Sequence, residues 1–161
     1  MSLDCIPLEE YSKFAKNHFR NASKQIDEEV IAMVYRQFEG ITWYIQRIMN
    51  ELFSITQAGG HCSVDMTTIA ISNILRANEF NYQSILFQLP PKQKELLIAI
   101  CKEGKAQNLT SSAFIQKYHL PGSSSVQSAI KGLIEKNFVT SNLGVYEVYD
   151  KFFAIWLLLS R

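Results

Sequence analysis

The second half of the sequence shows one fixed order of patterned segments, and this order restricts the fold more than any other feature. Apolar residues recur at helical spacing in residues 92–102, 112–118 and 124–134. Residues 138–149 then place β-branched and aromatic residues on both sides of a short loop that contains Gly144. That pattern is typical of a β-hairpin. Three helices followed by a hairpin are the order of a winged helix-turn-helix.

The first half reads as helical throughout. Apolar residues recur at helical spacing in four segments, which begin near Pro7, Asp27, Thr42 and Asp65. Gly40 is expected to end the second of these helices. We therefore predict a mostly α fold, in which a four-helix unit precedes the winged helix-turn-helix with its small β-hairpin.

The junction between the halves combines a proline pair with a change in the sign of the charge. Residues 1–90 carry seven Lys+Arg and ten Asp+Glu, a formal charge of −3, whereas residues 91–161 carry nine and five, a charge of +4. Because the residue before a proline avoids the helical region, Pro90-Pro91 predicts an interruption. We place two domains at residues 1–89 and 90–161, hinged at this step.

Composition excludes several classes of protein. Hydrophobic residues make up 47%, charged residues 19%, and the net charge is +1, which argues against disorder and against a strongly basic or acidic chain. The three cysteines are far apart in sequence, which disfavours disulfide frameworks and structural zinc sites. The longest apolar run, Phe152–Leu159, has eight residues, and a membrane-spanning helix needs roughly 20. We therefore expect a cytoplasmic protein without a membrane partner.

None of the common catalytic motifs occurs in the sequence. The single Gly-Lys pair, Gly104-Lys105, has Ala99 where the phosphate-binding motif G-x-x-x-x-G-K-[ST] requires its first glycine. His61-Cys62 follows two glycines, so a solvated loop is favoured over a metal site. Trp43 and Trp156 fit apolar patterns and are expected in the core. We expect no catalytic residue, metal ion or cofactor in this stretch of chain.

The third helix of the second half carries the residues that would read DNA in a helix-turn-helix, because that helix lies in the major groove. Its polar face holds Ser124, Gln127, Ser128 and Lys131, followed by Glu135. Gln pairs with adenine, Ser serves several bases, and Lys reaches guanine or phosphate. These four are our candidate DNA-binding residues. Nearby lysines would add phosphate contacts: Lys92, Lys94, Lys105, Lys117 and Lys136.

The same pattern also fits a surface with no role in nucleic-acid binding. Every amphipathic helix has a polar face, and Ser and Gln are common on such faces. The expected hairpin turn, Ser141–Gly144, contains no Lys or Arg that would hold a phosphate backbone. Both DNA and a protein partner therefore stay open as occupants of this face.

The segment Phe38–Gln46 resembles the lid subdomain of prokaryotic AAA-type ATPases of the archaeal-ATPase kind. Those lids carry a G-x-P/T-aromatic-Tyr-x-Gln stretch at the start of a helix. Residues 89–93, 123–126 and 148–153 are similar to stretches of the winged helix that follows the lid in the same proteins. The resemblance covers nearly the whole chain. It implies a parent protein that binds ATP and Mg²⁺, and hydrolyses ATP, through an N-terminal P-loop domain that lies outside this sequence.

Two further expectations follow from this resemblance. AAA lids commonly place an arginine early in the helix to sense the nucleotide phosphates, and the nearest arginine here is Arg47, about one turn after Trp43. Because the position departs from the family pattern, an ordinary surface role is the simpler expectation for Arg47. Met1-Ser2-Leu3, directly before the first helix, is similar to a start added for expression, which predicts a truncated form of a longer protein.

Our leading hypothesis is that the chain is the C-terminal lid and winged helix of an AAA-type ATPase. The lid would pass the nucleotide state across Pro90-Pro91 to the winged helix. Such a fragment is not itself an enzyme, because phosphoryl transfer needs the P-loop and its Mg²⁺. One alternative is a free-standing winged-helix transcription regulator, in which residues 1–89 dimerise or bind an effector. Another is a winged helix that docks a protein and has no contact with nucleic acid.

Overall fold

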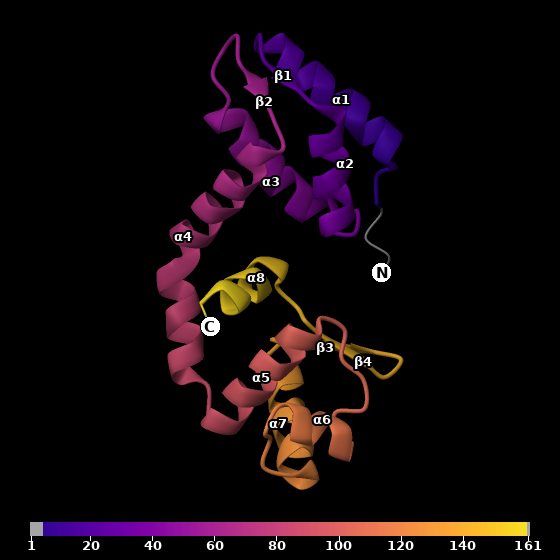
Figure 1. Cartoon of the computed structure of the whole chain (residues 1–161), viewed down its shortest axis with the longest axis vertical. Coiled ribbons are helices and arrows are strands. Elements are labelled where there is room, and N and C mark those ends of the chain that lie inside the picture. Colours follow the sequence, from indigo (N-terminus) through magenta and orange to yellow (C-terminus); the bar gives the residue numbers. More distant parts are fainter. Residues whose placement is uncertain (1–4, 161) are drawn as a thin grey trace. The chain divides into compact units, whose positions relative to one another are not determined.

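The computed structural model describes residues 5–160, which are mostly helical (Figure 1). Within that range, eight α-helices alternate with two pairs of short strands. The predicted fold class is confirmed, as is the order of elements predicted for the second half. Met1-Ser2-Leu3, interpreted above as an added start, lies outside the described residues. None of the helices in the described range is long and apolar enough to cross a membrane.

The chain divides into two compact units, a first unit of residues 1–77 and a second unit of residues 78–161. Helix α4 (Asp65–Gln88) passes from one unit into the other as a single helix. Helix α5 starts at Pro91, as the proline pair predicted, because a proline suits the first turn of a helix.

The last turns of α4 pack within the second unit. The Tyr82 ring lies 5.3 Å from the Phe153 ring and 5.5 Å from the Trp156 ring, measured between centroids, and all three side chains are buried. A proline pair ends a helix, but it does not determine which unit that helix packs against. The domain boundary placed between residues 89 and 90 therefore stays a prediction.

The four helical segments predicted for the first half are confirmed. Their apolar faces form one core, because each helix has apolar residues repeated at intervals of three and four. The elements are α1 (Leu8–Asn21), β1 (Gln25–Ile26), α2 (Glu28–Gln37), α3 (Thr42–Ile55), β2 (His61–Cys62) and the first part of α4. The buried side chains at the centre are Phe19, Val30, Ile31, Ile45, Ile48 and Leu52.

A tight turn at Gly40 joins α2 to α3. The Gly40 N–H donates to the Tyr35 carbonyl oxygen at 2.9 Å, and the φ angle of Gly40 is +71°. A Cβ atom at this position would lie 3.0 Å from the Tyr35 ring. Glycine ends α2 here because an L side chain would be strained by the backbone angle and would crowd the tyrosine.

The first unit also contains a parallel strand pair that the sequence did not predict. Strands β1 and β2 are two residues long, with Gln25 opposite His61 and Ile26 opposite Cys62. The His61-Cys62 pair therefore lies in a strand, and the expectation of a solvated loop was wrong. Cys62 is fully buried, whereas His61 is exposed.

The prediction that both tryptophans lie in the core was right for one and wrong for the other. Trp156 is 7% exposed, whereas Trp43 is 63% exposed. Trp43 stands in the first turn of α3, and the buried stripe of that helix begins at Ile45. Apolar spacing alone could not show that Trp43 falls outside this stripe.

The second unit contains the helices and the hairpin that the sequence predicted. They are α5 (Pro91–Glu103), α6 (Ser112–Lys117), α7 (Ser123–Glu135), β3 (Val139–Asn142) and β4 (Val145–Val148). The strands are antiparallel, with Val139 opposite Val148. Ser111 caps α6 because its side-chain oxygen accepts a hydrogen bond from the Phe114 N–H at 3.2 Å.

A final helix, α8 (Lys151–Leu159), completes the core of the second unit and was not predicted as an element. The Asp150 carboxylate caps it by accepting hydrogen bonds from the Phe152 and Phe153 N–H groups at 2.9 and 3.1 Å. The core gathers buried side chains from α5, α7 and α8: Leu96, Leu97, Ile100, Leu133, Phe153, Trp156 and Leu157.

Candidate functional site

Helix α7 presents the four predicted DNA-contacting residues on its exposed side. Val126, Ala129 and Leu133 are buried and turn this helix toward α5. The candidate residues stand at intervals of three and four, so they share the opposite face. The structure brings together Ser124, Gln127, Ser128 and Lys131, all exposed.

A pocket of about 310 Å³ lies beside this face, where the first turns of α5 and α7 meet. Ser124 and Ser128 line it together with Lys92, and the Lys92 ammonium donates to the Ser125 hydroxyl at 3.4 Å. Gln127 and Lys131 do not line the pocket. Ser124 and Ser128 therefore belong to the pocket, whereas Gln127 and Lys131 are exposed outside it.

The side chain of Gln93, which lines this pocket, lies close to Gly132 on α7. A Cβ atom at Gly132 would lie 2.3 Å from the Gln93 side-chain nitrogen. The Gln93 oxygen in turn accepts a hydrogen bond from the Lys136 ammonium at 2.8 Å. Glycine at this position leaves room for the Gln93 amide between the two helices.

We expect Gly132→Ala to change stability only slightly by itself but to stabilise a Gln93→Ala variant by about 1 kcal/mol. In the wild-type background, the gain in helix propensity is offset because the new methyl group displaces the Gln93 amide from Lys136. In the Gln93→Ala background, nothing opposes the gain. Urea unfolding of the four proteins measures this coupling. Equal effects of Gly132→Ala in both backgrounds would show that displacing the Gln93 amide from Lys136 does not lower the free energy of unfolding.

The hairpin presents an apolar tip. Leu143 is 97% exposed, with a φ angle of +50°, and the turn holds no Lys or Arg. A bridge between Ala106 and Tyr146 anchors the hairpin, since each N–H donates to the other residue's carbonyl oxygen at 2.8 Å. The hairpin is therefore held to the domain at Tyr146, and its tip is exposed and uncharged.

A comparison with known protein families identifies the helices and the hairpin of the second unit. The family described as a probable winged helix domain matches residues 80–159. These residues form a winged helix domain. Its start at residue 80 agrees with the packing of the last turns of α4 in the second unit.

This chain is also similar in fold to part of a larger protein. A Walker-type ATPase of Pyrococcus abyssi matches 93% of this chain with a TM-score of 0.59 and 17% sequence identity. The match covers 41% of the length of that protein. At this identity the likeness is one of fold. Among curated proteins, none matches this sequence.

The winged helix domain does not gather its lysines on one surface. Lys92 and Lys136 stand near Gln93 at the start of α5, whereas Lys117 stands near Glu103 at its end. The Lys117 ammonium donates to the Glu103 carboxylate at 2.8 Å, and this hydrogen bond lowers the pKa of Glu103 and raises that of Lys117. Lys117 is thus engaged in an ion pair within the winged helix domain.

Arg47, the candidate nucleotide-sensing residue, lies on α3 in the first unit. Its guanidinium is 3.9 Å from the Glu51 carboxylate, one turn further along the same helix. Glu51 also accepts a hydrogen bond at 3.0 Å from the Asn73 amide on α4. Arg47 therefore belongs to a polar cluster that joins α3 to α4, and its sensing role stays a prediction.

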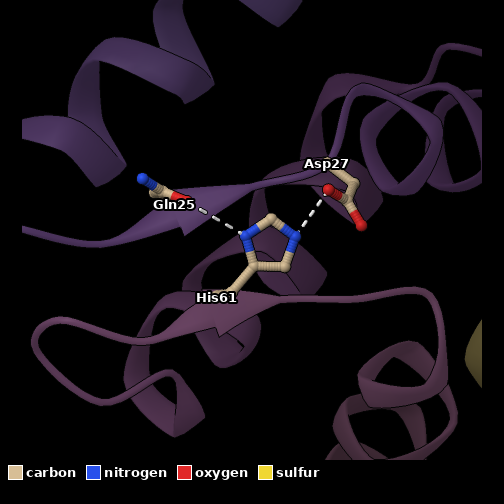
Figure 2. A network of polar contacts seen from close by, with 3 residues as sticks. All are labelled: Gln25, Asp27 and His61. Atoms are coloured by element: carbon tan, nitrogen blue, oxygen red, sulfur yellow. Dashed lines mark hydrogen bonds and ion pairs between the residues drawn. The ribbon is translucent and has the colours of Figure 1, made fainter.

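His61 is hydrogen-bonded within a side-chain network in the first unit. One ring nitrogen is 2.6 Å from an Asp27 oxygen and the other is 3.3 Å from the Gln25 amide oxygen (Figure 2). Asp27 stands at the N-cap of α2, but its side chain caps no backbone N–H. Within residues 5–160, no three His, Cys, Asp or Glu side chains are grouped as a metal would need.

Proposed function

We propose that this chain is the C-terminal part of a Walker-type ATPase and that it transmits the nucleotide state of that protein to its winged helix domain. The observation that carries the proposal is the fold likeness to such an ATPase over 93% of the chain, covering both units. The absence of the motif G-x-x-x-x-G-K-[ST] from this sequence also agrees with the proposal, since the P-loop would then lie in the other part of the protein.

In this proposal, the helical first unit acts as the lid of the nucleotide site in the longer protein. Helix α4 supports such a role because it is one continuous helix of 24 residues shared by both units. A displacement of its first turns would be carried to its last turns, where Tyr82 packs against Phe153 and Trp156 inside the winged helix domain. ATP and Mg²⁺ would bind to the other part of the protein.

An ATP hydrolysis assay tests this division of labour. We expect no turnover by the chain alone and measurable turnover by the full-length natural polypeptide. Removing residues 80–161 from that polypeptide should leave ATP binding intact. Hydrolysis by the chain alone would contradict the proposal, as would a natural polypeptide that neither binds nor hydrolyses ATP.

A second proposal concerns the winged helix domain, which we infer binds duplex DNA through α7. The supporting observation is that Ser124, Gln127, Ser128 and Lys131 form one exposed polar face. The exposed Glu135 follows one turn after Lys131, at the end of that face. The second unit carries nine Lys+Arg and six Asp+Glu, a formal charge of +3 that favours a polyanion.

We expect Lys131→Ala to weaken duplex binding and to reduce the slope of log affinity against log salt by about one. Lys102→Ala is the matched control, because Lys102 is an exposed lysine on α5, away from this face. Fluorescence anisotropy of a labelled duplex between 50 and 200 mM salt gives both quantities (roughly the range in which such slopes are measured). Equal slopes for the two variants would favour a protein as the occupant of α7.

A further inference from the structure

A second pocket lies in the first unit, beside the C-terminal end of α1, and basic side chains line it. Its volume is about 290 Å³, and its lining residues are Lys16, Arg20, Lys24, Gln25, Ile26 and His61. No acidic side chain belongs to this lining. The first unit as a whole carries seven Lys+Arg and nine Asp+Glu, a formal charge of −2. The positive lining is therefore a local feature of an acidic unit.

Backbone hydrogen bonds fix the walls of this pocket. Lys16 and Arg20 stand one turn apart on α1 and share a face. The chain then turns at Ser23, whose φ angle is +58° and whose carbonyl oxygen accepts from the Gly59 N–H at 2.7 Å. The Gln25 N–H donates to the Gly60 carbonyl oxygen at 3.0 Å. The second wall, strand β1, is thus held in place by its pairing with β2.

Three cationic side chains line the pocket, and two of them, Lys16 and Lys24, contact neighbouring groups. The Lys24 ammonium donates to the Phe53 carbonyl oxygen at 2.7 Å and lies 3.9 Å from the centre of the Phe53 ring. The Lys16 ammonium is 3.2 Å from a Glu28 oxygen, in a pair that is exposed to solvent. Both ammonium groups retain N–H donors beyond these single contacts.

The third cation, Arg20, has its donors available. Within residues 5–160, its guanidinium makes no hydrogen bond and no ion pair, and the side chain is exposed. A guanidinium offers five N–H donors in a planar fork that matches two oxygens of a phosphate. Three like charges around one hollow repel each other, and a bound anion would relieve that repulsion.

Two carboxylates stand beside this pocket, and each contacts one of its lining residues. The Glu28 carboxylate pairs with Lys16, and an Asp27 oxygen is 2.6 Å from a His61 ring nitrogen (Figure 2). Neither carboxylate is part of the lining itself. Within the described residues, Arg20 and Lys24 contact no carboxylate, so these two cations carry the positive charge of the pocket.

We infer that this pocket binds the phosphate group of a small molecule, with Arg20 as the two-pronged donor and Lys16 and Lys24 as flanking cations. The acidic run Asp27–Glu29 follows the lining directly. A nucleic-acid backbone that continued past the pocket would meet these carboxylates. A short anion, such as free phosphate or the phosphates of a nucleotide, can bind Arg20 and Lys24 without passing along this run.

Calorimetric titration of the full chain with inorganic phosphate, at constant ionic strength, tests this inference. We expect saturable binding that Arg20→Ala weakens about tenfold or more, since a hydrogen bond to a charged group is lost. Arg36→Ala is the control, because it removes the same charge from exposed Arg36 on α2, outside the pocket. Arg20→Lys should bind with intermediate affinity, since it keeps the charge but loses the fork.

Titrations with ATP and with a DNA duplex identify the source of the phosphate. Tighter binding of ATP than of inorganic phosphate, with the same dependence on Arg20, assigns the pocket to a nucleotide. Equal affinities assign it to free phosphate. Two results overturn the inference: wild-type protein that binds neither inorganic phosphate nor ATP saturably, and duplex binding as the only interaction that Arg20→Ala weakens. Equal phosphate affinities of Arg20→Ala and Arg36→Ala would also overturn it.

Discussion

Trp156→Ala should lower the free energy of unfolding of this protein by about 3–5 kcal/mol, the usual loss for a large aromatic side chain removed from a core. Trp156 is 7% exposed and its ring lies 6.0 Å from that of Phe153 and 5.5 Å from that of Tyr82. The substitution would leave a cavity where α8 meets the last turns of α4. Urea unfolding followed by circular dichroism measures the loss.

Trp43→Ala is the matched control for this substitution, because Trp43 is 63% exposed. We expect it to cost less than about 1 kcal/mol, the range of surface substitutions. Tyr82→Ala combined with Trp156→Ala should cost less than the sum of the two single losses, since the two rings are in contact. Equal losses for the two tryptophan variants would contradict the core described here.

The second large effect is a loss of stability in alkaline solution through Cys101. Burial raises the pKa of the Cys101 thiol from 9.0 to about 11, and the thiol donates to the Ala154 carbonyl oxygen at 3.2 Å. Between pH 9 and 11 the unfolded chain therefore loses this proton while the folded chain keeps it. The free energy of unfolding falls as the pH rises through this window, by about 2–3 kcal/mol in all.

Urea unfolding of the wild-type protein and of Cys101→Ala at several pH values separates this contribution from other titrating groups. The stability difference between the two proteins should be constant below pH 9 and should shift in favour of the variant as the pH rises toward 11. A difference that stays constant over the whole range would show that the thiol ionises equally in the folded and unfolded states.

The sequence predicted the helices and the hairpin of the winged helix domain because each of these elements has its own local pattern. Apolar residues repeat every three or four positions in α5 and α7, and a glycine-containing loop separates β3 from β4. Helix α8 was not predicted, because it has no such local pattern. Its apolar residues fall on all sides, so the run Phe152–Leu159 has no period from which a helix could be read.

Contacts between distant segments were beyond prediction from the sequence. Strands β1 and β2 have two residues each, too few for a period, and they pair across 36 positions between Gln25 and His61. The pocket around Arg20 depends on this pairing. One signal for it was present, namely basic residues at intervals of four in Lys16, Arg20 and Lys24.

The residues on α7 illustrate the remaining limit of sequence reasoning. Periodicity correctly placed Ser124, Gln127, Ser128 and Lys131 on one exposed face. It could not show that two of them line a pocket with Lys92. It also could not show that Lys117 is paired with Glu103, because that contact joins α6 to the end of α5.

The natural reading frame upstream of Asp4 tests the central claim most directly. If the chain is the C-terminal part of a Walker-type ATPase, that frame encodes a further domain with the motif G-x-x-x-x-G-K-[ST]. Sequencing the genomic locus gives the answer. A natural gene that begins at this methionine, or an upstream domain without a phosphate-binding motif, would contradict the claim.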